Sequence, residues 1–224
     1  MRRRRWLGIA ILVASVLAVA AGFWFVWFSP YLVVRSIDVS GADPRHIPAV
    51  EAVAGIATST PIARVDTSQA QSAIAELDWV QTVDVRRAWP DRIVIAITER
   101  IPVARAVQPG PDKAVDSTGA VFTPLDPLGS DVMAIAAEGP ALTSSVEVWL
   151  ALPEDIRKRV RRVTASTRDD ILLHLRNGSI VRWGSSDEPA FKAEVLLALL
   201  DRRARIYDVS APQLPTTLQE RKKS

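Results

Sequence analysis

Few side chains in this 224-residue sequence could do chemistry. The chain has no cysteine, which excludes disulfides and thiolate chemistry. Its two histidines are His46 and His174. We expect His46 in a first helix with no second histidine nearby, and His174 on a strand, alternating with Leu173 and Leu175 and facing away from the core. Zinc sites need several such ligands together, so the sequence predicts no metal site and no cofactor.

Adjacent carboxylates occur at Asp169-Asp170 and Asp187-Glu188. Neighbouring residues on a strand point to opposite faces, so these are interpreted as turn and cap residues rather than an acid/base pair. The sequence contains no Gly-x-Ser-x-Gly elbow, P-loop or His-Glu-x-x-His motif. Asn177-Gly178-Ser179 matches a glycosylation sequon but reads better as a hairpin turn. We therefore predict no catalytic residues and a protein that is not an enzyme.

The basic character of the chain is local. The sequence pI is about 9.6, but Arg2 to Arg5 supply four of the 28 basic residues, so the rest is nearly neutral against 25 acidic residues. A phosphate-binding face does not follow from such a pI. We expect neither nucleic acid nor a small-molecule substrate as a partner.

The stretch from Trp6 to Phe28 has Ser15 as its only polar side chain. A helix of 23 residues is about 34 Å long, enough for a hydrocarbon core of about 30 Å. The arginines before it place residues 1–5 in the cytoplasm as a short tail, and Ser29-Pro30 is expected to end the helix. The sequence thus predicts a single-pass, type II protein of the cell membrane, with the bulk of the chain outside the cytoplasm.

A cleavable signal peptide is the alternative for this segment. Ala18-Val19-Ala20 fits a cleavage site of small residues. Cleavage there would leave an aromatic, apolar N-terminus, so the uncleaved helix is favoured. Both readings place the body outside the cytoplasm.

Residues 31–100 have the pattern of a small α+β unit. A β-rich run ends at Gly41, with Ile37 and Val39 expected to face a core. A helix follows, capped by Asp43 and stopped by Gly55, and a second helix starts at Asp66. The first helix is expected to bury Ile47, Val50 and Val53, and the second Ala70, Ile74 and Leu77.

The most regular pattern is "VQTVDVRRAWPDRIVIAITE", from Val80 to Glu99. Apolar residues alternate on both sides of Trp89-Pro90, which predicts two strands joined by a hairpin loop. Trp89 is expected to pack over the end of this hairpin.

Residues 101–210 read as short strands interrupted by two helices. One helical segment is expected from Ser144, at a capping box, to Val160, with a break at Pro153. The other is expected from Pro189 to Arg203, with Phe191, Val195, Ala198 and Leu199 on one stripe. The last strand is expected at Arg205 to Ser210, stopped by Pro212 and Pro215. Residues 211–224 are expected to form a flexible tail. The fold class is therefore α+β, with a mixed, mostly antiparallel sheet and flanking helices in the second part.

Several motifs together resemble one family. "SIDVSG" (36–41) and "LDWVQTVDVRRAWPDRIVIAITERIPVA" (77–104) resemble the first strand and the hairpin run of the bacterial cell division proteins FtsQ and DivIB. Asp116, Gly119 and Phe122, then "LRNGSIVRWG" (175–184), Lys192 and "YDVSAPQLP" (207–215), follow in the order typical of that family. The resemblance covers nearly the whole chain.

The resemblance implies a fold, a place and a set of partners. Residues 31–100 would be a POTRA domain, and the following part a curved β-sheet domain. The protein would be a non-enzymatic scaffold at the division septum, binding FtsB and FtsL and, indirectly, the septal cell-wall synthases. A membrane-anchored cell-wall enzyme and a POTRA-type assembly chaperone are the alternatives.

The terminal strand is the expected contact with a partner, because a strand at a sheet edge offers unpaired backbone groups. The family resemblance implies FtsB binding there, at Ile206, Tyr207, Asp208 and Val209. Ile206 and Val209 could equally close the core, whereas Tyr207 is expected to point outward to the partner. Glu99, Arg100 and Pro102 are expected at the junction between the two domains.

Overall fold

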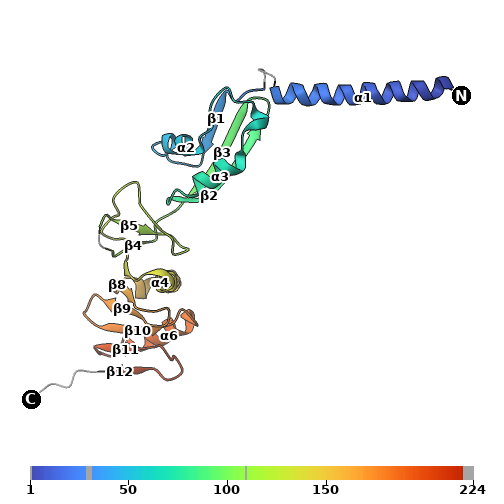
Figure 1. Cartoon of the computed structure of the whole chain (residues 1–224). Helices are drawn as coiled ribbons and strands as arrows, with labels where there is room; N and C mark the ends of the chain where they lie inside the picture. The colour runs from blue at the N-terminus through green and yellow to red at the C-terminus, as the bar shows by residue number, and fades with distance from the viewer. Residues whose placement is uncertain (1, 29–31, 109, 219–224) are drawn as a thin grey trace, which may run out of the picture. The chain divides into compact units, whose positions relative to one another are not determined.

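The computed structural model describes residues 2–28, 32–108 and 110–218, together with their side chains except those of 2–10, 25, 26 and 28. The chain divides into two compact units, Met1–Glu99 and Arg100–Ser224 (Figure 1). The division falls one residue before the end of the first domain expected from the sequence.

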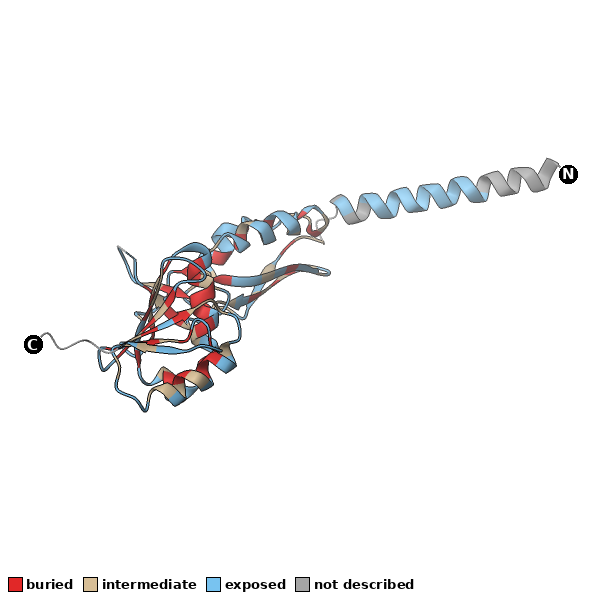
Figure 2. Cartoon of the chain, turned by 90° about the horizontal axis from the view of Figure 1, so that it is seen from below, coloured by how far each residue is buried: buried red, intermediate tan, exposed pale blue. Residues whose placement is uncertain are grey.

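Helix α1 runs over Arg2–Phe28. The side chains of residues 11–24 are exposed along its length (Figure 2). The described part of the chain contains no helix whose length and hydropathy meet the requirement for a membrane span. Ser29, Pro30 and Tyr31, expected to end the helix and begin the first domain, lie outside the described residues.

The first unit continues with the expected strand-helix-helix-strand-strand order. Its elements are β1 (Ser36–Ser40), α2 (Ile47–Ala54), the 3₁₀ turn η1 (Ile62–Arg64), α3 (Thr67–Ala75), β2 (Val80–Ala88) and β3 (Arg92–Glu99). In the described residues, the strands form a sheet of order β1-β3-β2, with β1 parallel and β2 antiparallel to β3. The longest strand pair is thus the hairpin that the sequence pattern predicted.

The alternation of apolar residues predicted for the hairpin agrees with the burial of their side chains in β3. Ile93, Ile95 and Ile97 of β3 are buried, while their neighbours Val94 and Ala96 are half-buried. The loop between the strands contains a cis Trp89-Pro90 peptide bond. The expectation that Trp89 packs over the hairpin end is wrong, because its side chain is 51% exposed.

Helix α2 starts later than the sequence suggested. Asp43 caps a preceding turn, where its Oδ1 accepts from the Arg45 N–H at 2.9 Å, and the helix begins at Ile47 with His46 at the N-cap position. Its buried residues are Val50 and Ala54, whereas Val53 is exposed. The sequence analysis therefore placed the last buried residue of this helix at Val53, one position before the residue that is buried, Ala54.

Helix α3 begins as predicted. Asp66 Oδ1 accepts from the Ser68 and Gln69 N–H groups at 3.0 and 2.9 Å, which satisfies two donors of the first turn. Ala70 and Ile74 are buried against the sheet. Ile37 and Val39 of β1 are half-buried.

The second unit contains a long mixed sheet. Its strands are β4 (Ala104–Ala106), β5 (Lys113–Val115), β6 (Val121–Phe122), β7 (Ala134–Ala136), β8 (Val160–Ala165), β9 (Ile171–Leu175), β10 (Ile180–Gly184), β11 (Ile206–Asp208) and β12 (Thr216–Leu218). Over the described residues the order is β12-β11-β10-β9-β8-β7-β4-β5-β6. Five of the neighbouring pairs are antiparallel and three parallel, which confirms a mixed, mostly antiparallel sheet.

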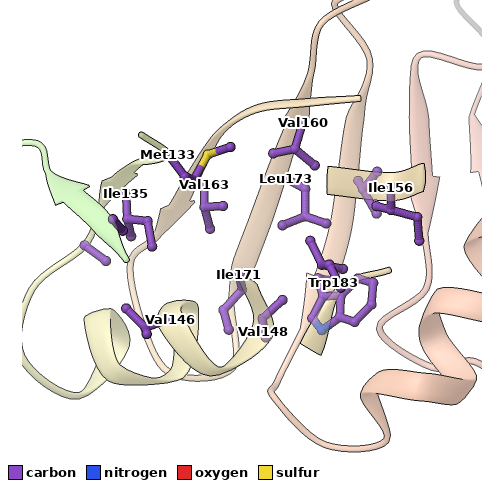
Figure 3. Packing of buried hydrophobic residues seen from close by; sticks show 14 of the residues in the cluster. Met133, Ile135, Val146, Val148, Ile156, Val160, Val163, Ile171, Leu173 and Trp183 are labelled. Atoms are coloured by element: carbon purple, nitrogen blue, oxygen red, sulfur yellow. The ribbon is translucent and has the colours of Figure 1, made fainter. Parts of the chain in front are cut away.

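Helices pack on this sheet to form one core. They are α4 (Gly139–Ala151), α5 (Glu154–Arg157) and α6 (Pro189–Leu199). Figure 3 shows Val146 and Val148 of α4 in the same cluster as Ile171 and Trp183 from the strands. The buried residues of this core come from positions between Ala104 and Val209, so the core is built from most of the second unit.

Two helices in the second unit differ from expectation. Helix α4 begins at Gly139, with Pro140 in its first turn, and Ser144 is buried inside the helix instead of capping it. In α6 the buried residues are Lys192, Ala193 and Leu196, while Phe191 is 41% exposed. Of the predicted stripe, Val195 and Leu199 are half-buried against the core, whereas Phe191 and Ala198 are exposed, so the stripe is correct in part.

Candidate partner-binding edge of the C-terminal sheet

Strand β11 was expected to be the free edge of the sheet, and this expectation is wrong. On one side it pairs in parallel with β10, with Ile180 opposite Ile206 and Val181 opposite Tyr207. On the other side it pairs antiparallel with β12, with Ile206 opposite Leu218. Because β11 has a neighbour on each side, its backbone is not the open ladder that a partner strand could extend.

Tyr207 lies in the core, which contradicts its expected outward direction. Its side chain is 2% exposed. The phenol Oη donates to the Arg202 carbonyl at 2.7 Å and accepts from the Ala204 N–H at 3.2 Å. Val209 is also fully buried. Residues two apart on a strand share a face, so this parity could have shown that Tyr207 points with Val209 into the core.

Ile206 and Asp208 point to the other face and are half-buried. Asp208 Oδ1 accepts from the Ser210 N–H at 3.1 Å and from the Ser210 Oγ at 2.6 Å. Its Oδ2 lies 3.9 Å from Nη1 of Arg182 on the neighbouring strand. Asp208 therefore closes the turn after β11, while Ile206 is left beside Leu218 on the outer face.

The outermost strand at this end is β12, which sequence reasoning assigned to a flexible tail. The chain turns back after β11, with the Leu214 N–H donating to the Ala211 carbonyl at 2.9 Å. Thr216–Leu218 then pairs with β11 and, among the described residues, with no other strand. Leu214 and Leu218 are 80% and 53% exposed. The β-branched Thr216 and Thr217 were the signal available in the sequence, and residues 219–224 of the expected tail lie outside the described residues.

Glu99 and Arg100 were expected to clamp the domain junction as a pair. In the structure Glu99 Oε1 accepts from the Asp43 N–H at 2.8 Å and lies 2.8 Å from His46 Nδ1, both in the first unit. Arg100 Nη1 donates to Asp116 Oδ2 at 2.5 Å in the second unit. Each of the two consecutive residues is thus bonded into its own unit, and Pro102 is exposed just beyond them.

Asp116 is the acceptor at the centre of a tight turn. It is 2% exposed, and its Oδ1 accepts from the Thr118 N–H, the Thr118 Oγ and the Ala120 N–H at 2.8, 2.6 and 3.0 Å. Burial, the largest single influence, raises the pKa of Asp116. The hydrogen bonds from Thr118, Arg100 and Ala120 together outweigh burial and hold the pKa below its ordinary value of 3.8. This carboxylate is therefore a structural group.

The histidines also take part in structural contacts. His46 stacks on Trp79 with 3.9 Å between ring centroids, in addition to its contact with Glu99. His174 Nε2 lies 2.9 Å from Thr164 Oγ1, and burial together with the charges of Arg162 and Arg161 lowers its pKa. Within the described residues, no three His, Cys, Asp or Glu side chains are grouped as metal ligands.

The expected turn role is confirmed for Asp170 and Asp187, whereas Glu188 makes no side-chain cap hydrogen bond. Asp170 Oδ2 accepts from Ser166 Oγ at 2.7 Å, and Asp187 Oδ2 accepts from Ser185 Oγ at 2.9 Å. Glu188 stands at the N-cap position of α6. Asn177 Oδ1 accepts from the Ser179 N–H at 3.0 Å in the β9–β10 turn, as the Asn-Gly pattern predicted.

Comparison with known proteins matches both units. Residues 32–100 match the family model of the FtsQ-type POTRA domain, and residues 104–211 match that of the C-terminal domain of cell division protein FtsQ/DivIB. Proteins named cell division protein FtsQ are similar over most of the chain. The one from Mycolicibacterium smegmatis is 35% identical over 91% of this chain and 62% of its own length.

Two further relatives are covered more completely. The Streptomyces venezuelae protein is 34% identical over 93% of this chain and 83% of its own length. The Corynebacterium glutamicum protein is 30% identical over 93% of this chain and 95% of its own length. This chain spans less than two thirds of the mycobacterial relative, but most of the other two. The protein therefore belongs to the FtsQ/DivIB family of bacterial cell division proteins.

Proposed function

We propose that this protein is a membrane-anchored, non-enzymatic scaffold of the division septum that binds FtsB and FtsL through the outer edge of β12. The partners would connect it to the septal cell-wall synthases. The observation that carries the proposal is the strand order of the C-terminal sheet, which ends at β12 with one hydrogen-bonded neighbour in the described chain. Membership of the FtsQ/DivIB family supports the divisome role.

The edge of β12 has the features that strand addition requires. A terminal strand presents backbone N–H and C=O groups to which an extended segment can bind, and alternate side chains give specificity. Leu218 and Ile206 stand opposite each other on the outer face, and Leu214 lies just before the strand. We infer that a partner strand pairs with β12 while its apolar side chains cover Leu218 and Ile206.

Support for the anchor comes from the sequence and exposure of α1. Ile11, Leu17 and Trp24 are 62%, 64% and 65% exposed in the isolated chain. These side chains expose a contiguous apolar surface, which is unfavourable in water and favourable in lipid. The arginines at its start favour a cytoplasmic N-terminus, which leaves both compact units outside the cytoplasm.

A charge on the outer strand tests the edge. In cells that produce the full chain with FtsB and FtsL, we expect Leu218→Lys to reduce co-purification of FtsB strongly, since a lysine at an edge opposes strand pairing. Val107→Lys is the matched control, because Val107 is also 53% exposed and lies in the same unit. This control is expected to keep wild-type recovery of FtsB.

The backbone is tested separately. Thr217→Pro removes an N–H group from β12, whereas Thr217→Val keeps it and the β-branched shape. We expect loss of FtsB with the proline variant only. Equal recovery of FtsB with Leu218→Lys, Thr217→Pro and wild type would place the contact elsewhere. Normal septation in cells depleted of the protein would contradict the divisome role, and hydrolysis of peptidoglycan by the purified full chain would contradict the non-enzymatic one.

A further inference from the structure

The tip of the β2–β3 hairpin carries an exposed aromatic side chain among arginines. Trp89 is 51% exposed, which is unusual for so large an apolar residue. Arg86 and Arg92 flank it on the two strands, with side chains 69% and 58% exposed. Nothing in the proposed contact with FtsB, which lies in the other unit, uses this tip.

The tip lies at the end of the three-stranded sheet where β1 begins. Strand β1 is parallel to β3 with Ser36 opposite Arg92, and the Arg35 N–H donates to the Asp91 carbonyl at 2.8 Å. The start of β1 is therefore beside the hairpin tip. Arg35 follows Phe28, the last residue of α1, by seven residues, which span at most about 25 Å when extended. A membrane that holds α1 is consequently within reach of the tip.

The charge at the tip has an excess of arginine. Arg35, Arg86 and Arg92 lie 3.8, 2.6 and 3.3 Å from carboxylate oxygens of Asp91, Asp84 and Asp38 respectively. Arg87 is held differently, since its guanidinium donates to the backbone carbonyls of Ile62 and Val65 at 3.1 and 2.6 Å. Its charge has no carboxylate partner among these contacts, so the arginines of the tip outnumber its acids.

We propose that the hairpin tip docks on the outer leaflet of the membrane, with Trp89 in the headgroup layer and the surrounding arginines facing lipid phosphates. Indole rings favour the membrane interface because one edge is apolar and the N–H can bond to a polar group. Guanidinium groups match phosphate oxygens in charge and shape. The proposal rests on the proposed membrane anchor, since that anchor brings the sheet end to the lipid.

The absence of cysteine in the sequence makes a direct test possible. Single cysteines are introduced into the full chain at Ala88, next to Trp89, at Gln81, at the opposite end of β2, and at Val13, in the middle of α1. Each variant carries a nitroxide label and is reconstituted in phosphatidylcholine vesicles, with and without phosphatidylglycerol. Spin-label depth is then measured from collisions with oxygen and with a water-soluble nickel chelate.

We expect the Val13 label in the hydrocarbon, the Ala88 label shielded from the nickel chelate, and the Gln81 label fully accessible to it. Phosphatidylglycerol should increase the shielding at Ala88. Trp89→Ala in the Ala88-labelled chain should abolish the shielding, and Trp89→Phe should retain part of it. An unchanged spectrum of the Gln81 label in the Trp89→Ala chain shows that the unit is still folded.

Each other result contradicts a defined part of the reasoning. An accessible Ala88 label together with a buried Val13 label would overturn the docking of the tip and leave the anchor intact. An accessible Val13 label would overturn the anchor and this inference with it. Shielding at Ala88 that appears only after a partner protein is added would show that the tip binds protein and would likewise overturn the proposal.

Discussion

Asp116 allows the contribution of a buried ion pair to be worked out and tested against an exposed one. Asp116→Asn keeps the size of the side chain, but its amide carries no charge to attract Arg100. The loss of one charge-assisted hydrogen bond costs about 1.5–3 kcal/mol, and the Arg100 side chain, 21% exposed, recovers part of its hydration. Asp116→Ala also removes the acceptor for Thr118 and Ala120, so we expect about 3–5 kcal/mol.

Asp112 provides the matched control. It also pairs with an arginine in the second unit, at 3.5 Å from Arg105, but its side chain is 50% exposed. Asp112→Asn should therefore change the stability by at most about 1 kcal/mol. The assay is urea unfolding of the full chain in detergent, followed by pulsed labelling of a cysteine placed at the fully buried Val163. Equal midpoints for Asp116→Asn and Asp112→Asn would refute the role given to burial.

The pH dependence of this pair has a defined sign. Because the pKa of folded Asp116 is lowered, its contribution is complete above the ordinary value of 3.8 and is lost as the pH falls below that value through the folded pKa. The second unit of the wild type should thus lose stability more steeply in acid than that of Asp116→Asn. Parallel acid-unfolding curves would contradict the lowered pKa.

Three other perturbations have clear expected results. Tyr207→Phe removes the hydroxyl group that bonds to the Arg202 carbonyl and the Ala204 N–H. It should lower the free energy of unfolding of the second unit in urea by about 1–2 kcal/mol, without loss of FtsB in the pull-down. Gly41→Ala should destabilise the first unit far more than Gly178→Ala destabilises the second. Both glycines have positive φ, but only at Gly41 would a Cβ meet a backbone oxygen, at 2.0 Å, so hydrogen exchange should separate them. The His174 pKa is lowered, so stability should decline as the pH falls below 6.5 through the folded pKa, and His174→Gln should remove that decline in thermal unfolding.

The first unit was largely predictable because its signals are local. One face of the β2–β3 hairpin is buried, which imposes a period of two on Val85, Ile93 and Ile95. Asp66 bonds N–H groups two and three residues ahead, and Gly55 ends α2 with φ of 61°. Each of these effects acts within a few residues, so the sequence alone contains the information.

The candidate site was less predictable because its contacts are long-range. β7 and β12 are three residues each, and their pairing partners lie far along the chain or beyond a proline-containing turn. Tyr207 was assigned outward, although its phenol finds backbone partners in the preceding loop. Lys192 was not expected among the buried residues, yet it is 2% exposed and its Nζ donates to the Ser185 carbonyl at 2.9 Å. Polar side chains with buried backbone partners give no local signal of burial.

The separate bonding of Glu99 and Arg100 bears on how tension would cross the protein. A pull on the second unit reaches the first along the backbone through the peptide bond between these two residues. On one side it is shared at once with Asp43, and on the other with Asp116. Stretching at this peptide bond is therefore opposed on each side by a hydrogen bond of a folded unit to the residue next to it.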